Sequence, residues 1–143
     1  MTKDVLITIA GLQIDLNEDE PVEVLSVGEY YYRNGKHYAL YDEYMSDEQY
    51  DGREICKNTI KITDNQIEIV KKGPVNVHMI FELGKKNISF YSTPFGEISI
   101  GIYTTSMEVH ESEGEIKAKL NYSLDMNNSH VSDCYITVSI NPR

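Results

Sequence analysis

The residues best suited to chemistry gather in one segment, residues 22–45, which reads VEVLSVGEYYYRNGKHYALYDEYM. Tyrosine hydroxyls and carboxylates alternate there with apolar side chains, and such groups can bind a polar ligand or transfer a proton. Asn34-Gly35 lies at the centre, and Asn-Gly between two alternating runs predicts a two-residue type I′ turn. The turn fixes the register of an antiparallel hairpin. The expected facing pairs are Arg33 with Lys36, Tyr31 with Tyr38, Tyr30 with Ala39, Gly28 with Tyr41, and Ser26 with Glu43.

The hairpin carries polar side chains on both of its faces. One set is Tyr30, Tyr41 and Glu43, and the set on the opposite face is Tyr38, Asp42 and Glu29. The alternation does not say which face is inside, so either set is a candidate to line a small-molecule site. A carboxylate inside a barrel would have a raised pKa, as a general acid or base requires. The structural alternative is that tyrosines close the barrel end through hydrogen bonds while the carboxylates lie at a solvated rim.

Other chemistry has no signature in this chain. The motifs GxSxG, GxGxxG, the P-loop, HExxH and CxxC are absent from the sequence. A metal site would need two or three histidines to converge. The four histidines, which fall on different predicted strands and turns, are His37, His78, His110 and His130. We therefore predict no catalytic residue, no metal and no cofactor.

Composition restricts the partners. The 143 residues include 23 acidic and 13 basic side chains, giving a formal net charge of −10. This charge argues against nucleic acid and anionic membranes as partners, because both are bound through Lys and Arg. Cys56 and Cys134 fall on the apolar phase of predicted strands, which indicates two buried free thiols, and we expect a reducing cytoplasm. The apolar run near residue 5 is too short for a signal peptide, and no run reaches the roughly 20 apolar residues of a membrane span.

Short alternating runs separated by turn residues continue to the end of the chain. The further predicted strands are residues 4–14, 54–63, 66–72, 75–83, 88–93, 97–109, 115–126 and 133–140. No stretch repeats with a helical period, so we predict an all-β fold in a single domain over residues 1–143. A meander of this many strands removes its edges by closing, which predicts a closed antiparallel up-and-down β-barrel of about eight to ten strands, with a two-sheet sandwich as the alternative. The expected core includes Phe81, Ile100, Ile116, Leu120, Tyr122, Leu124, Ile136 and Val138.

Two further features follow from the strand pattern. The turn at residues 93–96, Thr-Pro-Phe-Gly, predicts a positive φ at Gly96. Three consecutive strands, 75–83, 88–93 and 97–109, are expected to lie side by side with apolar and aromatic side chains on their outer face. These residues are His78, Ile80, Tyr91 and Tyr103. Such a patch is typical of a contact surface, so we predict a homodimer through this wall, with a partner protein as the second possibility.

Several short stretches, in this order and spacing, resemble one known family. They are residues 28–31 (GEYY), 38–43 (YALYDE), 91–96 (YSTPFG), Gly114 and residues 122–124 (YSL). Together they resemble the YwiB-like family of small bacterial proteins of unknown function. The resemblance covers the whole chain and implies a calycin-like β-barrel, related in shape to lipocalins and fatty-acid-binding proteins. It implies no catalytic residue.

Three hypotheses for function remain after these observations. The first is a barrel that binds a small apolar or amphipathic molecule through the polar groups of the first hairpin. The second is a protein-interaction or structural module that acts through the outer wall. The third is an enzyme that uses a tyrosine–carboxylate pair inside the barrel. A cavity of a few hundred Å³ favours the first, and a filled core favours the second.

Overall fold

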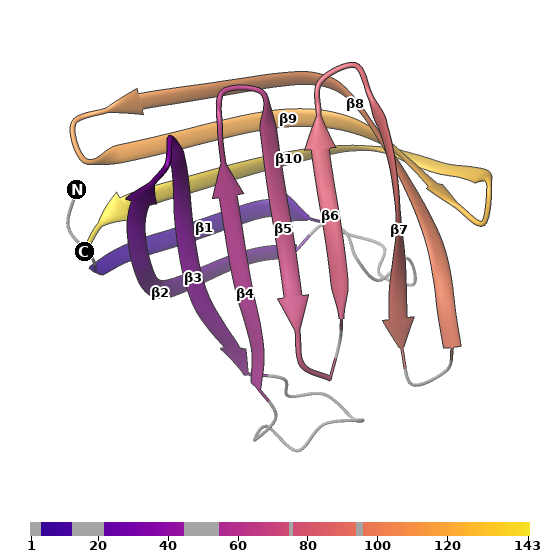
Figure 1. The fold of residues 1–143 in the computed structure, drawn as a ribbon, viewed down its shortest axis with the longest axis horizontal. Helices are drawn as coiled ribbons and strands as arrows, with labels where there is room; N and C mark the ends of the chain where they lie inside the picture. Colours follow the sequence, from indigo (N-terminus) through magenta and orange to yellow (C-terminus); the bar gives the residue numbers. More distant parts are fainter. Residues whose placement is uncertain (1–3, 13–21, 45–54, 75, 94–95) are drawn as a thin grey trace.

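All the regular structure in the computed structural model is β-strand, and ten strands follow one another along the chain (Figure 1). The structure describes residues 4–12, 22–44, 55–74, 76–93 and 96–143. The strands are β1 (Asp4–Leu12), β2 (Val22–Arg33), β3 (Lys36–Tyr44), β4 (Ile55–Ile62), β5 (Gln66–Lys72), β6 (Val77–Glu82), β7 (Lys86–Thr93), β8 (Gly96–Ser112), β9 (Glu115–Met126) and β10 (Ser129–Pro142). Within these ranges there is no helix long and apolar enough to cross a membrane.

The strands form one antiparallel sheet that curls into two crossing layers. Its order is β6-β5-β4-β3-β2-β1-β10-β9-β8-β7. In Figure 1, β1, β9 and β10 run across the view, whereas β3 to β7 run up and down. Strands β2 and β8 bend from one layer into the other, and each pairs with a different neighbour over its two parts. This arrangement is an orthogonal, nearly closed barrel.

The bend in β2 occurs at a glycine. Strand β2 pairs with β1 along its first part and with β3 only from Glu29 to Arg33. A Cβ atom on Gly28 would lie 2.3 Å from the carbonyl oxygen of Leu40, so only glycine lets the two backbones cross there. The hairpin register near the turn is as predicted, from Arg33/Lys36 to Tyr30/Ala39. The predicted pairs Gly28/Tyr41 and Ser26/Glu43 are wrong, because β2 has left β3 before it reaches them.

The barrel is closed by a seam between β6 and β7, not by a continuous ladder. These two strands are the ends of the sheet. Leu83 and Thr104 form a single parallel bridge, and the Gly84 amide donates a hydrogen bond to the Thr104 carbonyl at 2.9 Å. The predicted all-β antiparallel barrel of about eight to ten strands is confirmed, with closure nearly complete. Polar Asn87 and Ser89 occupy the inward phase of β7, so this strand has less apolar surface with which to pack against β6.

The core follows the predicted apolar phase. All eight expected core residues are buried: Phe81, Ile100, Ile116, Leu120, Tyr122, Leu124, Ile136 and Val138. The rings of Phe81 and Tyr122 meet edge to face at a centroid distance of 5.0 Å. Gly96 has a φ of 131°, as the turn motif predicted, while Pro94 and Phe95 lie outside the described residues. The interior between the layers is therefore packed with side chains.

Candidate functional site

The inward face of the first hairpin carries Tyr30, Ala39 and Tyr41. Tyr30 and Tyr41 are 6% and 4% exposed, and Glu43, in the same phase, is partly buried. The other candidate set lies on the outer face, where Glu29 and Asp42 are exposed and Tyr38 is half-buried. The sequence left this choice open because both faces carry tyrosines and a carboxylate. The inward residues then divide between two places, one at each end of β3.

At the start of β3, three side chains from distant parts of the chain form a hydrogen-bonded series. The Tyr30 hydroxyl lies 2.7 Å from Nδ1 of His37, and Nε2 of His37 contacts Oε1 of Glu111. The Glu111 carboxylate only accepts, so Nε2 carries the hydrogen. In a neutral imidazole Nδ1 is then an acceptor, and Tyr30 donates to it. We call this series the relay; it ties the hairpin to the end of β8 across the barrel.

Burial of the relay keeps its tyrosine neutral. Desolvation raises the pKa of Tyr30 above its ordinary value, and the negative charge of Glu111 raises it further. Nucleophilic or general-base chemistry by this phenol would need a lowered pKa. The relay therefore holds Tyr30 as a fixed hydroxyl whose oxygen still accepts a hydrogen bond.

Beside the relay lies an open groove of about 570 Å³. Tyr31 and Tyr32 are 42% and 60% exposed, and the centroid of the Tyr32 ring lies 4.9 Å from that of His37. The groove is lined by Tyr30, Tyr31, Tyr32, His37, Glu111, Ser112, Gly114, Glu115 and Ile116. A concave surface with apolar walls and a few convergent polar groups is the usual form of a small-molecule site.

At the far end of β3, a second polar cluster is buried between neighbouring strands. The Lys71 ammonium, 5% exposed as a residue, donates to Oδ1 of Asn58 at 2.6 Å and to Oε1 of Glu43 at 3.0 Å. Asn58 in turn donates to the Cys56 carbonyl at 3.0 Å. The ladders β3–β4 and β4–β5 place these side chains on one inward patch. We call this patch the lysine cluster.

Tyr41 lies in the same inward phase as the lysine cluster. Its hydroxyl is buried, with no hydrogen-bond partner among the residues that the structure describes. Burial raises the pKa of Tyr41 strongly, and the charge of Glu43 adds to the shift. Tyr41 is therefore a neutral phenol, like Tyr30, and a tyrosine–carboxylate pair here does not supply a phenolate.

The outer face has its own hollow where β2 separates from β3. This groove, about 710 Å³ in volume, has Val27, Leu40 and Val70 among its apolar walls. Its charged side chains are Glu29, Asp42, Lys57, Lys61 and Lys72. The groove therefore contains two residues of the outward candidate set, but its charges are of both signs and belong to the barrel surface.

The predicted outer-wall patch is partly assembled. His78 is exposed and contacts Glu68, Ile80 is half-buried, and Tyr103 is 43% exposed. The side chain of Tyr91 lies outside the described residues. The sequence analysis missed three exposed neighbours, at 52%, 61% and 59%, which are Leu83, Ile88 and Phe90. The ladder sets Ile88 opposite Gly101 on β8. An apolar surface therefore does exist along the outer side of the seam.

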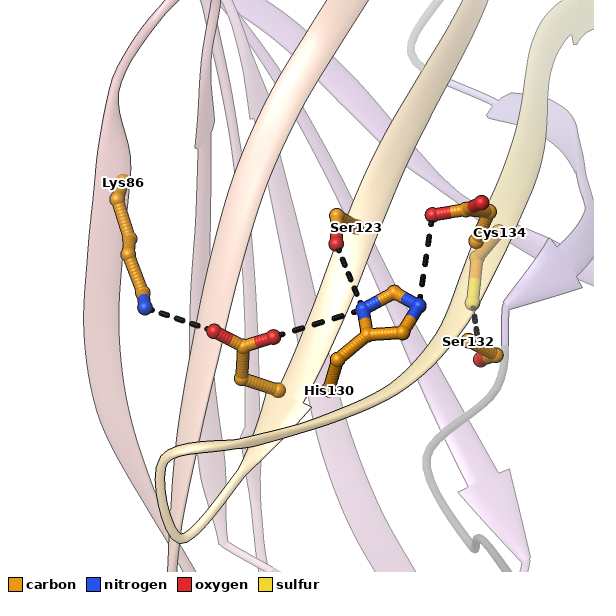
Figure 2. A network of polar contacts seen from close by, with 7 residues as sticks. Lys86, Ser123, His130, Ser132 and Cys134 are labelled. Atoms are coloured by element: carbon orange, nitrogen blue, oxygen red, sulfur yellow. Dashed lines mark hydrogen bonds and ion pairs between the residues drawn. The ribbon is translucent and has the colours of Figure 1, made fainter.

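Figure 2 shows a polar network on the outer wall with the composition of a catalytic triad. Ser123 Oγ lies 3.1 Å from Nδ1 of His130, and Asp133 lies 3.8 Å from Nε2. His130 and Asp133 are 56% and 89% exposed, and the contact to Asp133 exceeds hydrogen-bonding distance. A base that activates serine must itself be oriented by a third group on its other ring nitrogen. Asp133 is too distant to orient Nε2, and Asp125 lies 3.7 Å from Nδ1, the nitrogen that already faces Ser123. Asp125 in the same network pairs with Lys86 at 2.7 Å, which lowers its pKa.

Comparison with known proteins identifies the family and supports the barrel fold. The sequence matches the family described as "Domain of unknown function (DUF1934)" over residues 7–138. The chain belongs to this family. It is 25% identical over 119 residues to the "Uncharacterized beta-barrel protein YwiB" of Bacillus subtilis (strain 168), covering 83% of this chain and 76% of that protein. The crystal structure of the YwiB protein from Bacillus subtilis superposes with a TM-score of 0.77 at 21% identity, covering 99% of this chain and 92% of the other.

For this DUF1934 chain, the sequence analysis did not identify the residues that complete the relay and the lysine cluster. His37 was considered only as a candidate metal ligand, and Lys71 was not singled out. Glu111 lies 74 residues from His37, so no local pattern connects them. The one available signal was phase: His37 and Lys71 both fall on the buried alternation of their strands. Among the described residues, no three histidine, cysteine, aspartate or glutamate side chains converge as a metal site.

Proposed function

We propose that the protein is a non-enzymatic barrel that binds a small amphipathic molecule in the groove beside the relay. The observation that carries this proposal is the placement of the relay itself, which fixes three polar groups at the wall of an aromatic groove of about 570 Å³. Pre-oriented polar groups beside apolar walls reduce the ordering that binding requires. The raised pKa of Tyr30 supports binding over catalysis, because the phenol stays neutral. We place the protein in the cytoplasm on the basis of the two free cysteines, Cys56 and Cys134.

Native mass spectrometry of the protein purified from its source cell tests this function. A ligand held in the groove should appear as a discrete added mass of a few hundred daltons, the size that such a groove admits. Tyr32→Ala should remove this mass, because it takes away an exposed wall of the groove. Tyr44→Ala is the matched control, since Tyr44 is 66% exposed and lies at the other end of β3. An added mass that survives Tyr32→Ala, or is lost in Tyr44→Ala, would place the ligand elsewhere.

A second function is favoured by the seam. We propose that its outer side, with Leu83, Ile88, Phe90 and Tyr103, is a contact surface for a second copy of the chain. These side chains are 43–61% exposed, which is unusual for four large apolar residues so close together. His78 and Ile80 lie on the neighbouring strand β6.

Sedimentation equilibrium of wild type, Phe90→Glu and Leu25→Glu examines the dimer. Leu25→Glu is the control, because Leu25 is 63% exposed but lies on β2, away from the seam. Wild type and Leu25→Glu should dimerise at tens of micromolar, a common range for specific dimers, and Phe90→Glu should not. A monomeric wild type at that concentration would exclude the dimer.

A further inference from the structure

The groove beside the relay presents hydrogen-bond acceptors and few donors. When the hydrogen of His37 is on Nε2 alone, Tyr30 gives its only hydrogen to Nδ1, and its oxygen is left to accept. His37 uses both ring nitrogens within the relay. Glu111 contacts His37 through Oε1, and the Glu111 side chain is 54% exposed, so its carboxylate can accept further hydrogen bonds. A ligand that satisfies these groups must itself bring N–H or O–H donors.

The charges in the groove have one sign. Glu111 and Glu115 are part of its lining, and none of its nine lining residues is lysine or arginine. The nearest basic pair on the hairpin, Arg33 and Lys36, lies beyond the lining. The net charge of the whole chain, −10, adds a negative field around the groove. An anionic ligand is therefore disfavoured at short and at long range.

The aromatic walls favour a cation over a neutral donor. Tyr31 is stacked on Tyr38 on the outer side of the hairpin, with 4.9 Å between ring centroids, so the ring that lies beside the relay is that of Tyr32. Tyr32 packs against His37 and keeps 60% of its surface exposed. A cation over the face of a tyrosine ring is attracted by the ring quadrupole.

We propose that the groove beside the relay binds an organic ammonium ion, with its N–H groups on Glu111 and the Tyr30 oxygen and its hydrocarbon part against Tyr32. This inference rests on the proposed function and adds the class of ligand. It uses the relay as a positioning device: His37 orients the Tyr30 hydroxyl, and Glu111 serves both His37 and the ligand. Each of these contacts combines an acceptor or a ring face of the protein with a donor or a charge of the ligand.

Isothermal titration calorimetry of the full chain with three matched probes tests the proposal. The probes are 2-phenylethylammonium, 2-phenylethanol and 3-phenylpropionate, which share an aromatic end and differ in the charge of the polar end. The ammonium should bind roughly tenfold more tightly than the alcohol, and the carboxylate should not bind measurably. Glu111→Gln should weaken ammonium binding by roughly five- to tenfold, while its amide oxygen still accepts from His37. Glu108→Gln is the control, because it makes the same charge change on β8 at a side chain that is 68% exposed and not part of the groove.

The outcomes separate the ligand class from the proposed function. Equal affinity for ammonium and alcohol, both lost in Tyr32→Ala, would overturn the ammonium inference and leave the groove as a binding site. Equal weakening by Glu111→Gln and Glu108→Gln would also overturn it, because the attraction would then be the general field of an acidic protein. Tyr32→Ala changes an exposed side chain, so it keeps the test valid if Glu111→Gln fails to fold.

Discussion

The two ends of β3 both bring polar side chains into the barrel, but they differ in what those groups leave unused. At the first end, the relay consists of the neutral phenol of Tyr30, the imidazole of His37 and a largely exposed carboxylate beside an aromatic groove. At the other end, the Lys71 charge is buried and is bound by Asn58 and Glu43 from neighbouring strands. A buried charge with its partners beside it is mainly a structural element, whereas a fixed polar group at an open aromatic wall is suited to a ligand. The deeper burial of the lysine cluster is therefore not a sign of function.

Lys71→Met should have the largest effect on stability, because it removes the ammonium and leaves Asn58 and Glu43 without their shared donor. Loss of one partner of a buried pair destabilises by about 3–5 kcal/mol, and the partial exposure of Glu43 reduces this to about 2–4 kcal/mol. Urea denaturation monitored by circular dichroism measures the change. Ligand binding at the relay should survive in conditions where the variant is folded. A loss of stability below about 1 kcal/mol would mean that the lysine cluster is not structural.

Gly28→Ala should have the next largest effect on stability. It tests the bend at Gly28, where β2 leaves β3. The new Cβ would meet the Leu40 carbonyl at 2.3 Å and Cδ1 of Ile7 at 2.6 Å. Since one neighbour is backbone, the bend must shift, at a cost of about 1–3 kcal/mol. Gly35→Ala is a useful contrast, because a Cβ there meets nothing within 4 Å and the strain comes only from its φ of 77°. Thermal denaturation of both variants would contradict the steric account if Gly28→Ala were as stable as wild type.

Replacing a tyrosine by phenylalanine should have opposite effects on stability at the two ends of β3. Tyr30→Phe removes the donor to His37 and should destabilise by about 1 kcal/mol. Tyr41→Phe removes a buried hydroxyl that has no partner among the described residues, so it should be neutral or stabilising by up to about 1 kcal/mol. Chemical denaturation of both variants against wild type gives the two signs. Equal destabilisation by both would show that the hydroxyls are held alike and would remove this part of the comparison.

Particular residues show how much of the fold and of the candidate site could be predicted from the sequence. Asn34-Gly35 predicted the hairpin register close to the turn, and strict alternation predicted the core, because both depend on neighbours along the chain. The inward face of the hairpin could not be predicted, because Tyr30 and Tyr38 give the two faces the same polar character. The relay required contact between residues 74 positions apart, which only the crossing of the two layers brings about. The separation of β2 from β3 at Gly28 was not predicted, since a glycine opposite a tyrosine is compatible with a regular ladder.

Alkaline pH should lower the stability of the fold by a smaller amount, through ionisation of Tyr30 and Tyr41. The pKa values of Tyr30 and Tyr41 are raised in the folded state, so folding favours their neutral forms. Their contribution to stability is complete below the unfolded pKa of about 10 and is lost as the pH rises through the folded values. Tyr41→Phe should therefore lose less stability than wild type between about pH 9 and about pH 11. Parallel pH profiles for the two proteins would contradict the buried, neutral state of Tyr41.

The central claim is that ligands bind at the relay end of β3 and not at the lysine cluster. The most direct measurement is a 15N–1H NMR titration of the full chain with a mixture of small amphipathic compounds, following backbone amides at both ends of β3. The account predicts concentration-dependent shifts at Tyr30–Tyr32, His37 and residues 111–116, with Tyr41, Asn58 and Lys71 unchanged. Shifts confined to Tyr41, Asn58 and Lys71, with the relay end unchanged, would contradict it.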